Sequence, residues 1–146
     1  MTPAGLLPHA APMVLLDTVL RADAAGAEAA LTVRASDRFA RPGRGVPAHI
    51  AIEWMAQTCG AFAGAEAAAR NEPVRLGFLL GTRRFLATRP WFAPGEHLTV
   101  EATLVLREAG MGVFDCTVRD AAGDIRATAQ LTTYQPPDTP ASETAA

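Results

Sequence analysis

A long apolar segment without an internal proline is the feature that most restricts how this chain can fold. Residues 47–69 are mostly small residues or good helix formers, Pro47 suits the first turn of a helix, and Asn71 and Pro73 end the segment. A helix of this length is a rod of roughly 30 Å. Because apolar side chains lie on most of its sides, we expect the rest of the chain to enclose it.

The same segment is poorly suited to a membrane. Glu53, Gln57, Glu66 and Arg70 interrupt it, and charged side chains are costly in lipid. The N-terminus lacks a positively charged leader, and prolines break its apolar stretch, which argues against a signal peptide. We therefore expect a cytoplasmic protein with no membrane partner.

The composition favours a single globular domain. A chain of 146 residues with 49% hydrophobic residues can bury one ordinary core, and a net charge of −2 lacks the basic excess that nucleic-acid binding requires. Cys59 and Cys116 lack metal-type spacing and are expected to be free buried thiols. His49 and Glu53 have helical spacing but no third ligand, so no metal site is predicted.

Alternation of apolar and polar residues predicts strands on both sides of the helix. Residues 14–21 and 27–33 form a predicted hairpin, and residues 34–45, with four arginines, Pro42 and two glycines, form a loop. The strands predicted after the helix are residues 76–85, 98–107, 114–118 and 125–133. The expected order is two strands, one helix and four strands, an α+β fold with an antiparallel sheet that curls around the helix. The domain is expected to span residues 1–135, followed by a disordered tail at 136–146.

Three motifs resemble those of the β-hydroxyacyl-acyl-carrier-protein dehydratases. Residues 7–20 read Leu-Pro-His-Ala-Ala-Pro-Met-Val-Leu-Leu-Asp-Thr-Val-Leu, similar to the opening Leu-Pro-His-x-x-Pro-Phe-Leu-Leu-Val-Asp-Arg-Val of that family. Pro47 with residues 52–57 resembles its Met-Pro-Gly-x-x-x-x-Glu-x-x-Ala-Gln, and residues 94–98 resemble its Pro-Gly-Asp-x-Leu. The resemblance spans residues 7–134 and implies the hot-dog fold, in which a curved sheet wraps one long helix.

The resemblance also implies an active site shared between subunits. In that family the fold is a dimer with a continuous sheet, and a helix glutamate of one subunit faces a histidine of the other across an acyl tunnel. Glu53 stands at the glutamate position, but the loop at residues 38–44 has Phe39 or Ala40 where the family has histidine. This departure resembles the dehydratase-like proteins of aryl polyene pigment clusters, which share the Pro-Met-x-Leu-Leu-Asp and Ile-Glu-x-Met-Ala-Gln runs.

Elimination of water from a 3-hydroxyacyl thioester needs an acid and a base. Glu53 is the predicted acid, because desolvation in an apolar helix raises the pKa of a carboxyl group. The alternative is an ordinary glutamate on the helix surface. His49 and Gln57 lie four residues before and after it, on one helical face. Two histidines are candidates for the base, His49 and His9. The alternative for His49 is a solvated histidine in the first turn, and the alternative for His9 is a residue that only holds a turn.

Several further residues are predicted to bind the substrate. Unpaired backbone donors at the helix start, Gly45 to His49, suit the thioester oxygen, with Pro47 and Ala48 as predicted substrate-binding residues. Gln57 is also expected to contact the substrate. Gly77, Phe78 and Leu79 lie on the strand expected to line the tunnel, although plain sheet packing explains them equally well. Arg83, Arg84 and Arg89 are candidates to receive an acidic carrier protein or the phosphopantetheine phosphate.

Three functions remain open from the sequence. The first is a 3-hydroxyacyl-acyl-carrier-protein dehydratase of fatty-acid or aryl polyene synthesis, the second a thioesterase of the same fold, and the third a non-catalytic subunit of a hot-dog heterodimer. No cofactor is expected beyond the phosphopantetheine that carries the substrate. The expected partners are an acyl carrier protein and a second hot-dog subunit, identical or different, in a dimer or a higher oligomer.

Overall fold

A computed structural model describes residues 2–5, 14–74 and 77–136 of the chain. His9, with most of the first motif, and residues 137–146 of the expected tail lie outside these residues. The elements in chain order are η1 (Pro3–Gly5), β1 (Thr18–Asp23), β2 (Gly26–Thr32), β3 (Val46–Pro47), η2 (Ala48–Ile50), α1 (Ala51–Ala69), β4 (Phe78–Ala87), β5 (Trp91–Phe92), β6 (His97–Glu108), β7 (Met111–Arg119) and β8 (Ile125–Tyr134).

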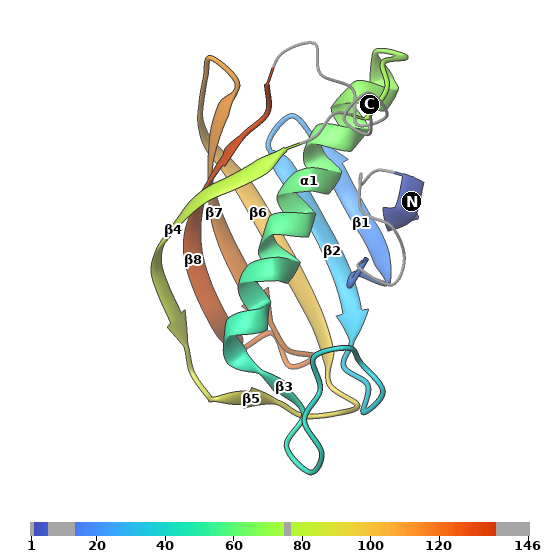
Figure 1. Ribbon diagram of the computed structural model, residues 1–146, viewed down its shortest axis with the longest axis vertical. Coiled ribbons are helices and arrows are strands. Elements are labelled where there is room, and N and C mark those ends of the chain that lie inside the picture. Colours follow the sequence, from blue (N-terminus) through green and yellow to red (C-terminus); the bar gives the residue numbers. More distant parts are fainter. Residues whose placement is uncertain (1, 6–13, 75–76, 137–146) are drawn as a thin grey trace.

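One antiparallel sheet of six strands, in the order β1-β2-β6-β7-β8-β4, forms the main layer. The sheet curves, and α1 crosses its concave face (Figure 1). Every second side chain of β7 points to the helix, namely Phe114, Cys116 and Val118, which are buried. The predicted α+β arrangement of one enclosed helix and an antiparallel sheet is confirmed.

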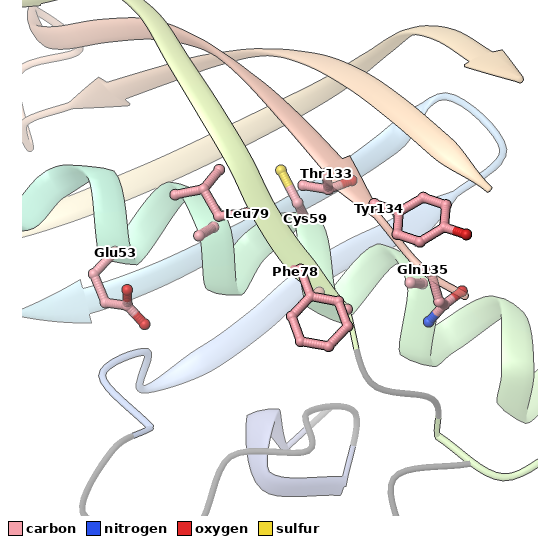
Figure 2. Close-up of a pocket in the computed structure, with 11 residues that line it drawn as sticks. Glu53, Cys59, Phe78, Leu79, Thr133, Tyr134 and Gln135 are labelled. Atoms are coloured by element: carbon pink, nitrogen blue, oxygen red, sulfur yellow. The ribbon is translucent and has the colours of Figure 1, made fainter. Parts of the chain in front are cut away.

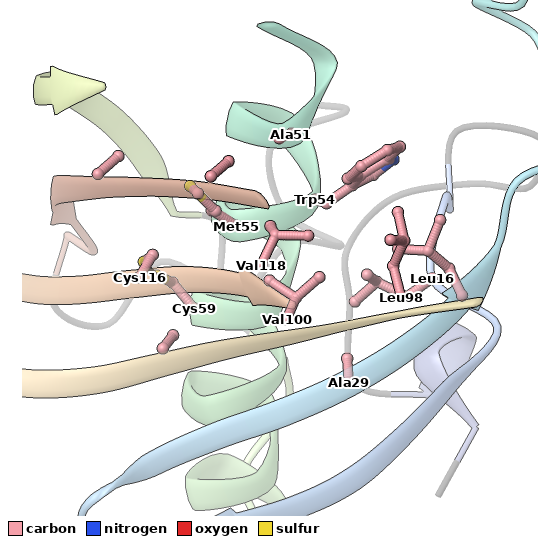
Figure 3. Packing of buried hydrophobic residues seen from close by; sticks show 14 of the residues in the cluster. Leu16, Ala29, Ala51, Trp54, Met55, Cys59, Leu98, Val100, Cys116 and Val118 are labelled. Carbon is pink, nitrogen blue, oxygen red and sulfur yellow. Dashed lines mark hydrogen bonds between the residues drawn. The ribbon is translucent and has the colours of Figure 1, made fainter. Parts of the chain in front are cut away.

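The core lies between α1 and the middle strands of the sheet. Figure 3 shows Met55 and Cys59 of the helix close to Val100, Cys116 and Val118 of the sheet. The two sulfur atoms lie 4.0 Å apart, and both cysteines are free and buried, as predicted. Burial raises the pKa of the Cys59 thiol. None of the helices in the described residues is long and apolar enough to cross a membrane.

The predicted start of the helix at Pro47 is wrong. Val46 and Pro47 form β3, which pairs with β5, and residues 48–50 form a single 3₁₀ turn before α1 begins at Ala51. Pro47 has an extended ψ of 142°, and the backbone N–H of Ala48 donates to the carbonyl oxygen of Pro90. Gly45, at φ 103°, lets the loop pass close to β5, because a Cβ there would overlap the carbonyl oxygen of Phe92.

The strand expected at residues 76–85 corresponds to β4, which extends to Ala87. It contains two register shifts, and Arg84, within the second one, has a φ of 54°. Within the described residues β4 pairs only with β8, so its other edge is unpaired. Its exposed large apolar residues are Phe78, Leu79, Leu80 and Leu86. An unpaired apolar edge of this kind is a surface on which another strand can add.

Candidate active site

A cavity of 290 Å³ lies between α1, the start of β4 and the end of β8. The helix contributes the small side chains of Ala56, Gly60 and Ala63, which are spaced four and three residues apart and therefore share one face. Figure 2 shows Glu53 at one end of this cavity and Tyr134 with Gln135 at the other. The result is a narrow apolar groove along the helix with one carboxyl group at its end.

Glu53 is held in place by a buried neighbour. It is partly buried and lies in the first turn of α1. The Gln57 side chain donates from Nε2 to Oε1 of Glu53 at 3.2 Å, and its own Oε1 accepts the backbone N–H of Leu15 at 2.8 Å. Gln57 has no exposed surface. It therefore orients Glu53 and ties the helix to the segment before β1.

The structure brings together some of the predicted substrate-binding residues. Gly77, Phe78 and Leu79 line the cavity opposite the helix, which is where the tunnel strand was expected. Pro47 and Ala48 do not line this cavity. Proline has no N–H, and the N–H of Ala48 donates to the carbonyl oxygen of Pro90, so neither residue offers the unpaired backbone donor that was expected. Their binding of the substrate stays a prediction.

Gln57 is not among the residues that line the cavity, and its amide contacts Glu53 and Leu15. These contacts position the carboxyl group. The predicted contact of Gln57 with the substrate stays a prediction. The sequence spacing of four residues correctly indicated that the two side chains meet.

The histidines stand apart from this arrangement in the described residues. His49 is exposed in the 3₁₀ turn, so the helical spacing used to align it with Glu53 does not apply. Nδ1 of His97 lies 2.9 Å from Oγ1 of Thr32 on the neighbouring strand, which fits the structural role expected for it. The catalytic roles of His49 and His9 stay predictions.

Sequence reasoning missed part of the cavity wall. Ala56, Gly60 and Ala63 carry no chemical signal of their own, although their spacing marks one helix face. Cys59 also borders the cavity. Thr133, Tyr134 and Gln135 close the far end from the end of β8 and just beyond it. Their position depends on how β8 pairs with β4, which the sequence does not encode locally.

The contact between Gln57 and Glu53 gives a first prediction. Gln57→Leu keeps the volume but removes the donor to Glu53 and leaves the Leu15 N–H without its acceptor. We expect a loss of about 1–3 kcal/mol in the free energy of unfolding, the cost of a buried unsatisfied donor. Urea denaturation measures it. Gln130→Leu is a matched control, because that amide lies on the opposite, exposed side of the sheet; an equal loss in both variants would contradict the role of Gln57.

Comparisons with known proteins give matches at the level of family and fold. The ApeP-like family model, described as ApeP dehydratase, matches residues 1–144. The dehydratase heterocomplex ApeI:P from Xenorhabdus doucetiae contains a chain with 32% identity and a TM-score of 0.88, covering 94% of this chain and 93% of that one. A search of curated proteins found no match.

More distant structures share the fold. A hypothetical thioesterase with coenzyme A from Streptococcus pneumoniae TIGR4 has 12% identity and a TM-score of 0.64, covering 80% of this chain and 83% of that one. The PaaI protein of the E. coli phenylacetic acid degradation operon has 14% identity and a TM-score of 0.64, covering 80% of this chain and 81% of that one. These matches confirm the predicted hot-dog fold and, at such low identity, say nothing more.

Proposed function

Because this chain belongs to the ApeP-like dehydratase family, we propose that it eliminates water from a 3-hydroxyacyl thioester held on an acyl carrier protein, in fatty-acid or aryl polyene synthesis. The predicted resemblance to the dehydratase-like proteins of aryl polyene clusters is thereby confirmed. One observation carries the proposal: Glu53 stands at the end of a narrow apolar cavity that runs along α1. An acyl chain in this groove places its thioester end beside the carboxyl group.

The proposed chemistry assigns one step to Glu53. A base takes the proton from C2, the C3–O bond breaks as the C2–C3 double bond forms, and the departing hydroxyl takes a proton and leaves as water. Glu53, in its protonated form, donates that proton. The hydrogen bond that Gln57 donates to Oε1 of Glu53 holds the carboxyl group in position for this transfer.

A second subunit is proposed to complete the site. The unpaired edge of β4 carries exposed apolar side chains, and Phe78 and Leu79 on this strand also border the cavity. A strand that pairs with β4 would bury these side chains and bring its own residues close to Glu53. The similar chain from Xenorhabdus doucetiae is part of a heterocomplex. We therefore propose a heterodimer in which the partner hot-dog subunit supplies the base.

The carrier protein is proposed to approach from the side of β4. Arg83 and Arg84 on this strand and Arg89 just after it are exposed. Acidic side chains of a carrier and the phosphate of phosphopantetheine both suit guanidinium groups. For the thioesterase alternative, the hypothetical thioesterase of 12% identity shows only a shared fold.

The test is product analysis with a 3-hydroxyacyl carrier protein. The chain is purified both alone and with its co-expressed second hot-dog subunit. The mass of the carrier-bound product is then measured by mass spectrometry. We expect a loss of one water with the acyl group still attached to the carrier, and we expect it from the two-subunit preparation. Release of free acid would replace the proposal with a thioesterase. Full activity of the chain alone would refute the heterodimer.

A further inference from the structure

The two cysteines are reactive groups of the core that the proposed elimination does not use. Cys59 of α1 and Cys116 of β7 are 57 positions apart in the chain, and their sulfur atoms lie 4.0 Å apart (Figure 3). They are 3% and 2% exposed, and the sequence contains no other cysteine. Each thiol therefore has a single partner within this chain, and the two are already in contact.

A disulfide between these cysteines requires a small movement. The bond is about 2.05 Å long, so the two sulfur atoms have to approach each other by about 2 Å. Cys59 borders the cavity of 290 Å³ beside Glu53 and also a smaller cavity of 160 Å³. Because a cavity places no packed atoms against that side of the residue, a turn of the side chain and a slight shift of α1 meet little resistance.

The same cavities give a small oxidant access to one of the two thiols. One water molecule occupies about 30 Å³ of liquid, so a peroxide molecule, which is little larger, has room in a cavity of 290 Å³. Cys116 is not among the residues that line either cavity. Burial raises the pKa of the Cys59 thiol, so little of the reactive thiolate is present and oxidation needs a concentrated oxidant. Cys59 is therefore the thiol that meets the oxidant, and Cys116 is the thiol that can react with it next.

We propose that Cys59 and Cys116 form a reversible disulfide when a small peroxide enters the cavity, and that this bond narrows the groove along α1. The Cys59 sulfur attacks one oxygen of hydrogen peroxide, the O–O bond breaks, and a sulfenic acid and one water form. The Cys116 sulfur then attacks the sulfenic sulfur, the S–O bond breaks, and the hydroxyl leaves with the thiol proton as a second water. The two thiols together lose two electrons, which the peroxide accepts. A dithiol reductant reverses the bond by thiol–disulfide exchange.

The disulfide acts at a defined depth of the groove. This inference rests on the proposed dehydratase function, which places the thioester at Glu53. Cys59 lies six positions after Glu53 on α1, or roughly 9 Å along the helix axis. A four-carbon acyl group ends before this depth, whereas a long chain has to pass Cys59. The cavity lies between the helix and the sheet, so drawing α1 toward β7 narrows it, and oxidation should slow the turnover of long chains and spare short ones.

The first experiment follows the bond itself in the folded two-subunit complex. The complex is treated with hydrogen peroxide, free thiols are blocked with an alkylating reagent, and this chain is digested without reductant for mass spectrometry. We expect a peptide pair that joins Cys59 to Cys116, and recovery of both thiols after treatment with dithiothreitol. Sulfinic or sulfonic acid at Cys59 without the linked pair, or a linked pair that forms only after the chain is unfolded in urea, would overturn the proposal.

Two variants assign the order of the steps. Cys116→Ala removes the second thiol, so the reaction should stop at a sulfenic acid on Cys59, which dimedone traps. Cys59→Ala removes the thiol at the cavity, so Cys116 should stay reduced. Alanine is small and apolar like the buried thiol, and thermal unfolding shows whether each variant is folded. Oxidation of Cys116 in folded Cys59→Ala would contradict the proposed route, and the peptide pair from the unsubstituted protein decides the bond whether or not the variants fold.

The second experiment measures elimination by the reduced and the oxidised complex from a four-carbon and a long 3-hydroxyacyl carrier protein. Oxidation should lower kcat/KM for the long chain at least about 10-fold, since a displacement of about 1 Å costs up to about 100-fold, and should change the value for the short chain by less than about twofold. In Cys59→Ala, peroxide should leave the ratio of the two values unchanged. An equal loss with both chains, or no loss with either, would overturn the narrowing of the groove. No elimination by the reduced complex would overturn the proposed function, while the peptide pair still decides the disulfide.

Discussion

Replacing Glu53 with glutamine is expected to lower kcat for elimination at least about 100-fold, because general acid catalysis contributes 10²–10⁴ to such steps. The amide has nearly the shape of the carboxyl group and can still accept the bond from Gln57, but it does not release a proton at the rate the reaction needs. Since Glu53 is only partly buried and its amide replacement keeps this bond, the melting temperature should change little. Product formation and thermal unfolding are measured on the same two-subunit preparation.

The control for this variant is Glu101→Gln, a carboxylate on the exposed face of β6 outside the cavity. It should leave kcat within twofold of the unsubstituted protein, because no step of the proposed reaction involves it. If Glu53→Gln keeps more than one tenth of the kcat of the unsubstituted protein, Glu53 is not the acid. His49→Ala and His9→Ala, assayed in the same way, decide whether the base belongs to this chain or to its partner.

Long periodic segments made most of the fold predictable. The helix was predictable from a long run of helix-forming residues without an internal proline. β6, β7 and β8 extend over nine or more residues each, so their period of 2 is clear. β3 and β5 have two residues each, and a pair of residues has no period. The helix start was misplaced for a related reason: Pro47 is compatible with a first helical turn and with an extended strand, and only its pairing with Trp91 decides between them.

The parts of the site that could be predicted are those that a sequence motif or a residue spacing indicates. The family motif marked Glu53, and the glycine before Phe78 marked the strand that borders the cavity. The ring contact between Phe62 of α1 and Phe114 of β7 was not foreseen, because the two residues are separated by 52 positions in the chain. Such a contact forms only after the sheet has curved around the helix, and no local sequence pattern predicts it.

The largest expected effect on stability comes from an acidic residue that the sequence presented only as part of a motif. Glu96, next to Gly95 in the turn before β6, forms an ion pair with Arg126 of β8. The Arg126 side chain is only 3% exposed, and its guanidinium also lies 5.0 Å from the ring centre of Phe92. The other nearby carboxylate, that of Asp120, is 3.9 Å away. Glu96 is therefore the main partner of a buried charge.

Glu96→Ala is expected to cost about 3–5 kcal/mol in the free energy of unfolding, because it leaves the Arg126 charge buried without its main partner. Urea denaturation measures the loss. Glu101→Ala removes an exposed carboxylate 3.6 Å from Arg21 and should cost at most about 1 kcal/mol. Adding Arg126→Met to Glu96→Ala should restore part of the stability, since an apolar side chain of similar size needs no counter-charge. If Glu96→Ala and Glu101→Ala cost the same, or the double variant is the less stable one, the buried charge does not govern stability at this end of the sheet.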